Sequence, residues 1–339
     1  MRGPAELAMD EWVGTSSGDP GISGSIGLQH YKLCLEDARV IIPVRNGGAR
    51  WREAAAALGR AVGRSDQVIV IDSDSTDGSD RVAAEQGFIL ERIDVRTFNH
   101  GRTRQEAFAR HCGEVPLVIY MTQDAVVNGA ESLTNILSAF DDSRVGAAYG
   151  RQLPHVGAHP IEVHGNEINF PEQGSVRSFA DAARFGIKTA YISNSFAAYR
   201  AVALRECGGF PSHLILGEDA FVAMRMLLSG WHIAYCANAR VSHSHGYSVK
   251  EELERFFDYG VMHAQCADLV DRFGNSSDTG WRYLRSELRF IGRTAPWLLP
   301  EVGLRTLLKY AGYRLGRNYR HLPNGLRRRL SMTKGYWNT

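Results

Sequence analysis

Two stretches of sequence decide the fold, VIVIDSDSTDGS at 68–79 and VIYMTQDA at 118–125. Each is an apolar run that breaks abruptly into acidic and small polar residues, which is typical of a buried parallel strand that ends at a ligand site. In open α/β sheets, ligands bind outside the carboxyl ends of the strands. The sequence therefore predicts that Asp72 and Asp124 reach one edge of a sheet, where a nucleotide and a metal ion would meet.

The flanking sequence continues this alternation of short apolar strands with helices. The alternation predicts βαβ units and a parallel sheet. After 125 the pattern loosens, and the polar stretch 155–178, with its Pro and Gly residues, predicts an active-site loop. Strands are expected at 38–44, 67–71, 88–93, 116–121, 145–149, 192–199 and 233–236, and helices at 51–62, 79–86, 102–111, 133–139, 220–229, 250–260, 280–291 and 302–314.

Composition limits the class of protein. The 339 residues are 44% hydrophobic and 22% charged, an ordinary globular balance that allows one large or two modest domains. Five dispersed cysteines without a CxxC pair predict reduced thiols in a cytosolic protein, with neither a disulfide framework nor a zinc site. The polar stretch 1–36 predicts a loosely ordered leader, without a signal-peptide pattern. No apolar run reaches the ~20 residues that span a bilayer, so we expect a cytoplasmic protein, soluble or peripheral at the inner face of the plasma membrane.

Asp72 is a candidate ligand for a nucleotide base. A carboxylate at the end of a buried strand can accept the imide N–H of uracil or thymine. The alternative is a helix N-cap cluster, because small polar residues follow at 75–77. The preceding strand also ends in a Gly-rich loop, in IIPVRNGG at 41–48, and two such loops favour a nucleotide cradle.

Arg102 and Arg104 follow a glycine turn at the start of a helix. Guanidinium groups at a helix N-terminus suit a diphosphate. The alternative is a solvated basic helix face.

Asp124 is a candidate ligand for Mg²⁺ or Mn²⁺. These ions are often held by one or two carboxylates together with diphosphate oxygens and water. His243 and His245 alternate along an extended segment, so they face opposite sides, and one of them could complete the metal site. The alternatives are an aspartate that caps the next helix and a purely structural pair of histidines.

Glu218 and Asp219 open an apolar helix in GGFPSHLILGEDAFVAMRMLLSG at 208–230. They could be caps stabilised by the helix dipole. However, two adjacent carboxylates are more than a cap needs, and an inverting group transfer requires a base that takes a proton from the attacking hydroxyl. The pair is therefore a candidate for that base.

The C-terminal part is strongly basic. After 285 it contains many Arg and Lys residues but only Glu287 and Glu301 as acids, and Trp, Leu and Tyr residues are interleaved among the cations. Such helices suit an anionic membrane surface. A solvated face is one alternative; nucleic-acid binding is another, but no RNA or DNA motif supports it, so no nucleic-acid partner is expected.

An ordered set of segments resembles a known family. IIPVRNGG, VIVIDSDSTDGS, FNHGRTR, TQDA, YGRQLP, ISNSFAAYR, GGFP with GED, and GWHIAY with ARVSHSH are together similar to family 2 glycosyltransferases of the GT-A fold over 38–250. TQDA, YGRQLP and SHSH, with GYRLGRNYRHLP near the end of the chain, resemble the rhamnosyltransferase branch, which uses dTDP-L-rhamnose. The resemblance implies an α/β GT-A fold, a Rossmann-like mixed and mostly parallel sheet with a C-terminal helical extension. It places the catalytic domain at 37–250 and makes 251–339 a basic helical region, a candidate contact for a membrane surface or acceptor.

The resemblance also implies roles for the chemical groups. Asp219 would be the general base with Glu218 beside it, and Asp124 the metal ligand of the DxD-type motif. His243 would be a further metal ligand, with His245 as the fallback.

One departure from the family pattern lies just before Asp124. The motif usually has another acid there, whereas this chain has Thr122 and Gln123. The nucleotide-sugar would be bound by Pro43, Arg45, Asn46, Asp72, Asp74, His100, Arg104, Gln123 and Asp124, and the sugar or acceptor by Tyr149, Arg151, Gln152, Asn194 and Trp231.

The expected function is inverting transfer of L-rhamnose from dTDP-L-rhamnose to a hydroxyl of a lipid-linked saccharide in bacterial surface polysaccharide synthesis. The cofactor would be Mg²⁺ or Mn²⁺. A family 2 transferase that uses a UDP-hexose or a UDP-N-acetylhexosamine is the nearer alternative, because Asp72 can bind uracil or thymine. A non-catalytic nucleotide-sugar or glycan-binding module is the more distant one. The sequence does not predict the oligomeric state.

Overall fold

The computed structural model describes residues 33–274 and 277–338, so the predicted leader lies outside the described residues up to position 32. In this described part, nine strands form one sheet in the order β3-β2-β1-β4-β8-β6-β9-β5, and β7 pairs with β9. Pairing is parallel from β3 to β4 and between β6 and β9, whereas β8 is antiparallel to both of its neighbours. The predicted mixed α/β sheet is confirmed. The strands are β1 (Ala38–Val44), β2 (Val68–Asp72), β3 (Ile89–Arg92), β4 (Leu117–Met121), β5 (Val126–Val127), β6 (Val145–Leu153), β7 (Ser175–Arg177), β8 (Phe196–Arg200) and β9 (His232–Ser242).

The helices follow the strands in the predicted alternation and then take over the C-terminal third. None of the described helices combines the length and apolar character needed to cross a membrane. The α-helices are α1 (Gly48–Ala61), α2 (Ser79–Glu85), α3 (His100–His111), α4 (Glu131–Leu137), α5 (Pro160–Asn169), α6 (Ala182–Phe185), α7 (Ala201–Glu206), α8 (Glu218–Leu228), α9 (Val249–Gln265), α10 (Ala267–Phe273), α11 (Ser277–Thr294), α12 (Leu299–Arg317) and α13 (Asn324–Leu330). Short 3₁₀ turns join several of them, among them η8 (Pro296–Leu298).

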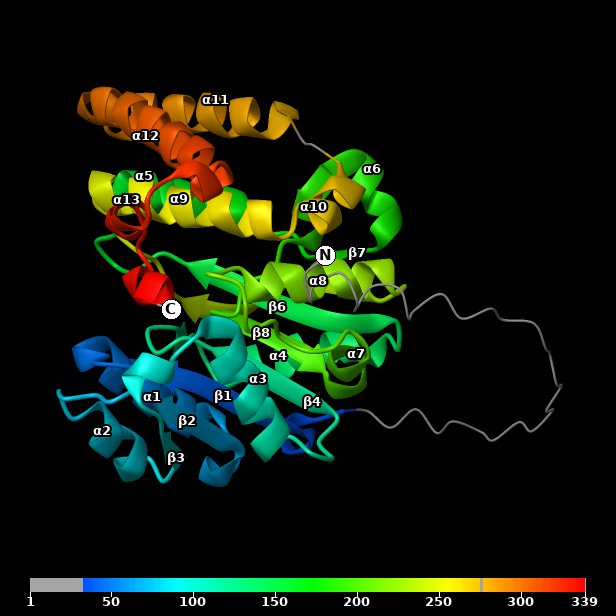
Figure 1. Cartoon of the computed structure of the whole chain (residues 1–339). Coiled ribbons are helices and arrows are strands. Elements are labelled where there is room, and N and C mark those ends of the chain that lie inside the picture. The colour runs from blue at the N-terminus through cyan, green and yellow to red at the C-terminus, as the bar shows by residue number, and fades with distance from the viewer. Residues whose placement is uncertain (1–32, 275–276, 339) are drawn as a thin grey trace, which may run out of the picture. The chain divides into compact units, whose positions relative to one another are not determined.

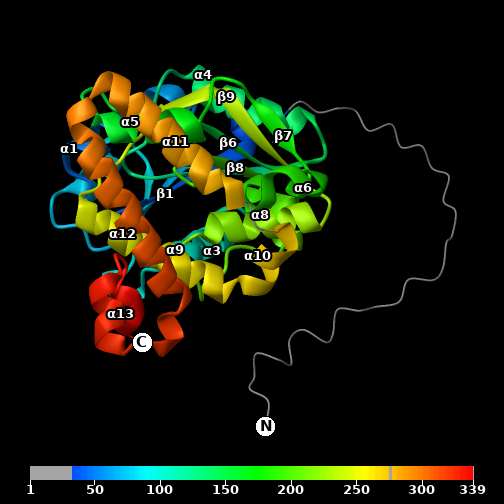
Figure 2. The same ribbon diagram turned by 90° about the horizontal axis from the view of Figure 1, so that it is seen from above.

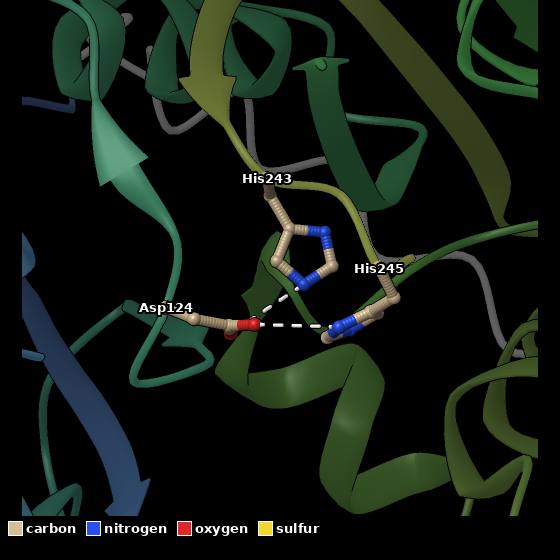
Figure 3. A group of neighbouring side chains, drawn as sticks. All are labelled: Asp124, His243 and His245. Atoms are coloured by element: carbon tan, nitrogen blue, oxygen red, sulfur yellow. Dashed lines mark ion pairs between the residues drawn. The ribbon is translucent and has the colours of Figure 1, made fainter. Parts of the chain in front are cut away.

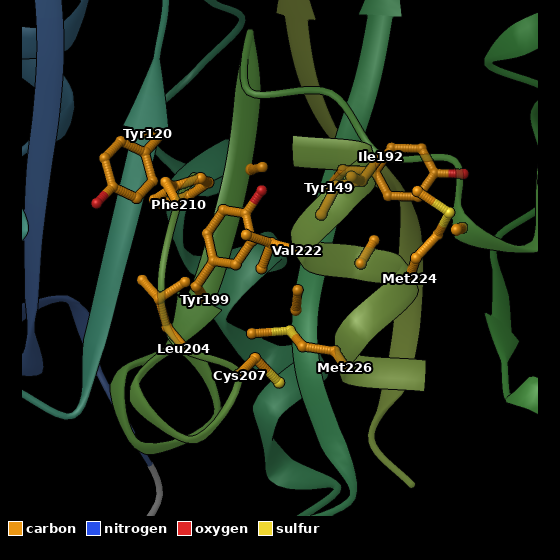
Figure 4. Close-up of a cluster of buried hydrophobic side chains, with 14 of the residues drawn as sticks. Tyr120, Tyr149, Ile192, Tyr199, Leu204, Cys207, Phe210, Val222, Met224 and Met226 are labelled. Carbon is orange, nitrogen blue, oxygen red and sulfur yellow. The ribbon is translucent and has the colours of Figure 1, made fainter. Parts of the chain in front are cut away.

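The central strands are apolar on both faces because helices cover both faces. In β1, Val40 and Ile42 belong to the core under α1 and α4, whereas Ile41 points to the core under α3 and α8. Tyr120 of β4 and Tyr199 of β8 lie side by side in the core under α3 and α8, with ring centroids 5.7 Å apart. Figure 4 shows these rings among aliphatic and sulfur side chains of the neighbouring helices. Together the two cores hold the strand ends that form the site.

The C-terminal helices form an outer layer over α5 and α9 (Figures 1 and 2). Helix α12 packs closely along α9 because glycines of α12 face the backbone of α9. A Cβ atom at Gly316 would lie 2.0 Å from the carbonyl oxygen of Phe257, and one at Gly312 would lie 2.5 Å from that of Leu253. A larger residue at either position would force the two helices apart.

Two predictions about local structure are wrong. The stretch 155–178 is not a single loop, because it contains α5 and β7. A proline at the start of α5 and the hydrogen bond from the backbone of His159 to Glu162 favour that helix, and α11 covers its apolar side. The strand predicted at 192–199 begins only at Phe196, because the preceding residues turn toward the start of α8.

Candidate active site

The start of α8 presents the two acids that the sequence singled out. Gly217 precedes them with a φ of 77°, a left-handed conformation that favours glycine. Asp219 accepts hydrogen bonds from the backbone N–H of Asn194 at 3.1 Å and of Ala220 at 2.8 Å. The carboxylate is therefore held in a fixed direction at the wall of a cavity.

The environment of Asp219 prepares it to act as a base near neutral pH. Burial raises its pKa, the charge of Glu218 raises it further, and two backbone N–H groups partly oppose the rise, which leaves a value of about 6. A catalytic base works best when its pKa lies close to the working pH. This carboxylate is therefore suited to take a proton from a hydroxyl.

Glu218 is held in its charged form by neighbouring groups. Its Oε1 lies 3.1 Å from a terminal nitrogen of Arg104 and accepts a hydrogen bond from the side chain of Asn194 at 3.1 Å. Burial alone would raise the pKa of Glu218, but Arg104 and then His100 lower it below its usual range. Burial lowers the pKa of His100, and the negative charge of Glu218 partly opposes this shift. Arg104 is thus engaged with an acid, and a contact with a diphosphate stays a prediction.

A second group of side chains lies where β4 and β9 end. Asp124 Oδ1 is 3.5 Å from His243 Nε2, and Asp124 Oδ2 is 3.6 Å from His245 Nδ1. Figure 3 shows the three side chains pointing toward one another. In the described part of the chain, this is a cluster of acidic and imidazole ligands that could hold a metal ion, and it includes both the predicted His243 and the fallback His245.

The hydrogen bonds of His243 fit a metal ligand. Its Nδ1 lies 2.8 Å from Oε1 of Gln152, and Nε2 of Gln152 donates to the Ser193 hydroxyl at 2.8 Å. The amide oxygen of Gln152 must then accept a proton from Nδ1, which leaves the lone pair of His243 on Nε2. That buried Nε2 has no hydrogen-bond partner among the described residues and faces the carboxylate of Asp124.

A cation between the lone pair of His243 and the carboxylate oxygen of Asp124 would be bound by both atoms. Ligand atoms about 2.1 Å from one ion lie roughly 3 Å apart, close to the separations seen here. Burial lowers the pKa of His245 to about 4, which keeps this ring neutral and able to bind a metal. The donor set can therefore hold a divalent metal ion.

The carboxyl ends of β1 and β2 form the predicted cradle. Asp72 is buried; its Oδ2 accepts a hydrogen bond from the backbone N–H of Ser75 at 3.0 Å, and its Oδ1 has no partner among the described residues. Asn46 adopts a φ of 46°, and its side-chain oxygen accepts from the backbone N–H of Thr76 at 2.8 Å. The two loops therefore brace each other, and one carboxylate oxygen of Asp72 is left to accept a proton from a ligand.

Two other predicted residues, Gln123 and Asp74, shape the cradle through hydrogen bonds to backbone groups. Gln123 accepts from the N–H of Arg45 at 2.7 Å and donates to its carbonyl oxygen at 3.2 Å. Asp74, with a φ of 54°, accepts from the N–H of Val95 at 2.8 Å. Pro43 lies in β1 opposite Ile71, and the Arg45 side chain is exposed. Gln123, which stands where the motif usually has an acid, thus fastens the Gly-rich loop to the end of β4.

A cavity of about 870 Å³ lies between the two histidines of the metal cluster and the acids at the start of α8. It reaches from His243 and His245 past Asp219 to the inner side of α12. Of the predicted sugar or acceptor residues, Gln152 and Asn194 line it.

The other three predicted sugar or acceptor residues lie elsewhere. Tyr149 is buried in the core against Tyr235, and Arg151 pairs with Glu172. Trp231 lies just before β9, at the opposite end of that strand from His243, and donates to Glu206.

Arg255 on α9 is a cavity residue that the sequence analysis did not identify. Its guanidinium donates to the hydroxyl groups of Tyr247 and Tyr259 and lies over both rings. The three other Arg and Lys side chains found in the described cavity wall each lie next to a carboxylate, whereas Arg255 forms no ion pair within the described part of the chain. No motif marks this residue, because a single Arg on an amphipathic helix looks like a solvated side chain.

A family model confirms what this geometry indicates. The model described as Glycosyl transferase family 2 matches residues 39–208, a span that contains the cradle and Asp124. The chain belongs to glycosyl transferase family 2. The predicted enzyme class, a glycosyltransferase, is therefore confirmed.

Relatives of this transferase extend the match to almost the whole chain. It is 42% identical over 301 residues to the O-antigen chain rhamnosyltransferase WbaN of Salmonella anatum. This match covers 88% of this chain and 95% of the relative. It is 40% identical, with the same coverage, to the O-antigen chain rhamnosyltransferase RfbN of Salmonella typhimurium. The predicted resemblance to the rhamnosyltransferase branch is confirmed.

A solved structure has a similar fold. The mannosyltransferase PcManGT from Pyrobaculum calidifontis, in complex with GDP-Man and Mn²⁺, matches this transferase with a TM-score of 0.51 at 18% identity. The match covers 89% of this chain and 84% of that protein. It supports the GT-A fold of the transferase.

Proposed function

We propose that this transferase moves an L-rhamnosyl group from dTDP-L-rhamnose to a saccharide hydroxyl, with inversion at the anomeric carbon. The observation that carries the chemistry is Asp219, a carboxylate in the cavity wall with a pKa raised to about 6. The choice of rhamnose is supported by the two relatives, which are named O-antigen chain rhamnosyltransferases and cover 88% of the chain.

A single displacement accounts for the inversion. Asp219 takes the proton of the acceptor hydroxyl while the hydroxyl oxygen forms a bond to the anomeric carbon. The bond from this carbon to the diphosphate oxygen breaks on the opposite face, and its electron pair leaves with dTDP. The backbone N–H groups of Asn194 and Ala220 hold the base in position throughout.

The leaving diphosphate needs positive charge, and Arg255 can supply it. A partly buried guanidinium without a carboxylate partner suits an anionic ligand, because an unpaired charge in a cavity is otherwise costly. Asp124 and His243, with His245, would hold Mg²⁺ or Mn²⁺, which as a Lewis acid would reduce the charge developing on the diphosphate. The free Oδ1 of Asp72 would accept the imide N–H of thymine.

The acceptor we propose is a lipid-linked saccharide at the inner face of the plasma membrane, in the synthesis of a surface polysaccharide. The names of the two relatives refer to the O-antigen chain. On the side of the C-terminal helices, Tyr283, Arg305 and Lys309 line the cavity and could contact such an acceptor.

Donor turnover tests the proposal. The purified protein would be incubated with dTDP-L-rhamnose, UDP-glucose, UDP-galactose or UDP-N-acetylglucosamine, each with Mg²⁺, Mn²⁺ or EDTA. We expect turnover of dTDP-L-rhamnose alone, and its loss with EDTA. Preference for a UDP-sugar would keep the fold and the base but overturn the rhamnose assignment. If no donor is turned over without an acceptor, calorimetry would compare the affinities for the four donors. Tightest binding of dTDP-L-rhamnose would then support the rhamnose assignment.

A further inference from the structure

Helices α11 and α12 expose large apolar side chains on their outer sides. Trp297 is 74% exposed, Trp281 71%, Leu307 69% and Tyr310 64%. On α12, Leu307 and Tyr310 lie opposite Gly312, which contacts α9. Apolar residues at this exposure, gathered on one pair of helices, mark a surface that contacts something other than water. We call this surface the α11–α12 face, formed by Trp281, Leu288, Trp297, Leu304, Leu307 and Tyr310.

Arginine side chains surround these apolar groups. Those at 282, 285, 289, 293 and 314 are exposed, and none of them forms an ion pair within the described part of the chain. The two acids on these helices whose side chains are described do not offset this charge. Glu287 is buried and Glu301 binds Arg305 on the inner side. Charge on this face is therefore positive.

We propose that the α11–α12 face docks on an anionic lipid bilayer. Trp and Tyr rings with Leu side chains insert at the level of the headgroups, while the arginines pair with lipid phosphates. An interface with a second copy of this chain would bring the same arginines together, which disfavours that occupant. A nucleic acid would use the arginines but leave the leucines without an apolar partner.

Helix α12 connects this face to the cavity. Its inner side carries Arg305 and Lys309, which line the cavity and contact Glu252, and its outer side carries Leu304 and Leu307. A bilayer on the outer side therefore lies one helix away from the cavity wall. A saccharide carried on a lipid would reach the base past α12, and this last step rests on the proposed function.

Vesicle binding of the full chain tests the proposal without donor or acceptor. Co-sedimentation would compare vesicles of phosphatidylglycerol and phosphatidylcholine with vesicles of phosphatidylcholine alone. We expect binding to the anionic vesicles, which a Trp297→Ser, Leu307→Ser, Tyr310→Ser variant reduces at least about tenfold. An Arg285→Gln, Arg289→Gln, Arg293→Gln, Arg314→Gln variant should reduce it similarly, and salt should weaken wild-type binding.

Control variants change exposed apolar residues and exposed arginines on other surfaces. A Val156→Ser, Val176→Ser, Val202→Ser variant removes exposed apolar groups elsewhere, and an Arg52→Gln, Arg60→Gln, Arg81→Gln variant removes exposed cations from α1 and α2. Both should bind vesicles like the wild type, and thermal unfolding would verify that every variant is folded.

Three outcomes would overturn the proposal. The first is equal binding to anionic and neutral vesicles, and the second is an equal loss of binding in the control variants. The third is a protein that does not bind vesicles but self-associates or binds RNA through the face, so that the face variants abolish this association. Hydrolysis of the donor in solution should not change in the face variants, so failure of the donor assignment and failure of the docking surface are distinguishable.

Discussion

The backbone N–H of Asn194 donates a hydrogen bond to Asp219 Oδ2 at 3.1 Å. The side chain of the same residue donates to Glu218 Oε1 at 3.1 Å, and its own oxygen accepts from the Tyr199 hydroxyl at 2.7 Å. One asparagine therefore orients two adjacent acids whose pKa values are shifted in opposite directions. The charge of Glu218 is balanced by Arg104, which leaves Asp219 as the acid that can exchange a proton with a ligand.

Asp219→Asn should abolish transfer while leaving donor binding intact. General base catalysis contributes about 10²–10⁴-fold, so we expect kcat to fall by that range. The amide keeps the size of the carboxylate, but its single oxygen can accept only one of the two backbone N–H bonds, from Asn194 or from Ala220. Transfer would be measured with saturating donor, and donor affinity by calorimetry. Full transfer activity in this variant would show that another group is the base.

The rate of transfer should rise with pH through about 6, the pKa of Asp219. The base is protonated and inactive below this value and charged above it. We therefore expect kcat/KM to increase about tenfold per pH unit on the acid side and to level off above pH 7. A profile from pH 4.5 to 8 at fixed ionic strength would measure this. A rate that is independent of pH across this range would contradict the assignment.

The central part of the fold could be predicted because its strands are buried on both faces. Residues 68–71 and 117–121 are continuous apolar runs, and the polar residues after them lie at the predicted sheet edge. Helix α5 was missed because its sequence is polar and its Ile161 is buried only under α11, which no local pattern reveals. The pairing of Glu218 with Arg104 was missed for a similar reason. The partners are far apart in the sequence, and only the packing of α3 beside α8 brings them together.

Gln152→Met should weaken metal binding although Gln152 is not a metal ligand. Its amide oxygen accepts the Nδ1 proton of His243 at 2.8 Å and thereby keeps the lone pair on Nε2. Loss of such a partner typically costs 10–100-fold in metal affinity. Mn²⁺ affinity, measured by electron paramagnetic resonance, should fall by about this factor and should be lost in His243→Ala. Gln86→Met, at the end of α2, is the control. Unchanged Mn²⁺ affinity in Gln152→Met would rule out this positioning role.

Glu218→Gln should destabilise the protein, because it leaves the guanidinium of Arg104 buried without a counter-charge. The two side chains are 7% and 5% exposed, and breaking a buried pair from one side costs about 3–5 kcal/mol. The free energy of unfolding would be measured by urea denaturation at pH 7. Asp80→Asn breaks the exposed pair with Arg92 and should have a far smaller effect. Equal effects of the two substitutions would mean that Glu218 and Arg104 do not form the pair in solution.

Asp72→Ala should remove discrimination between nucleotide bases. Oδ1 of Asp72 is buried without a partner, so an imide N–H of thymine or uracil can donate to it, whereas N3 of cytosine is an acceptor and would be repelled. A hydrogen bond to a charged group contributes about 1.5–3 kcal/mol, so the affinity for dTDP should fall about 10- to 100-fold, while the weak binding of CDP changes little. Calorimetry with dTDP, UDP and CDP would measure this. Asp66→Ala, in the turn before the other end of β2, should change none of the three affinities. If Asp72→Ala still prefers dTDP over CDP by the wild-type factor, the base is bound elsewhere and the cradle between β1 and β2 has a structural role.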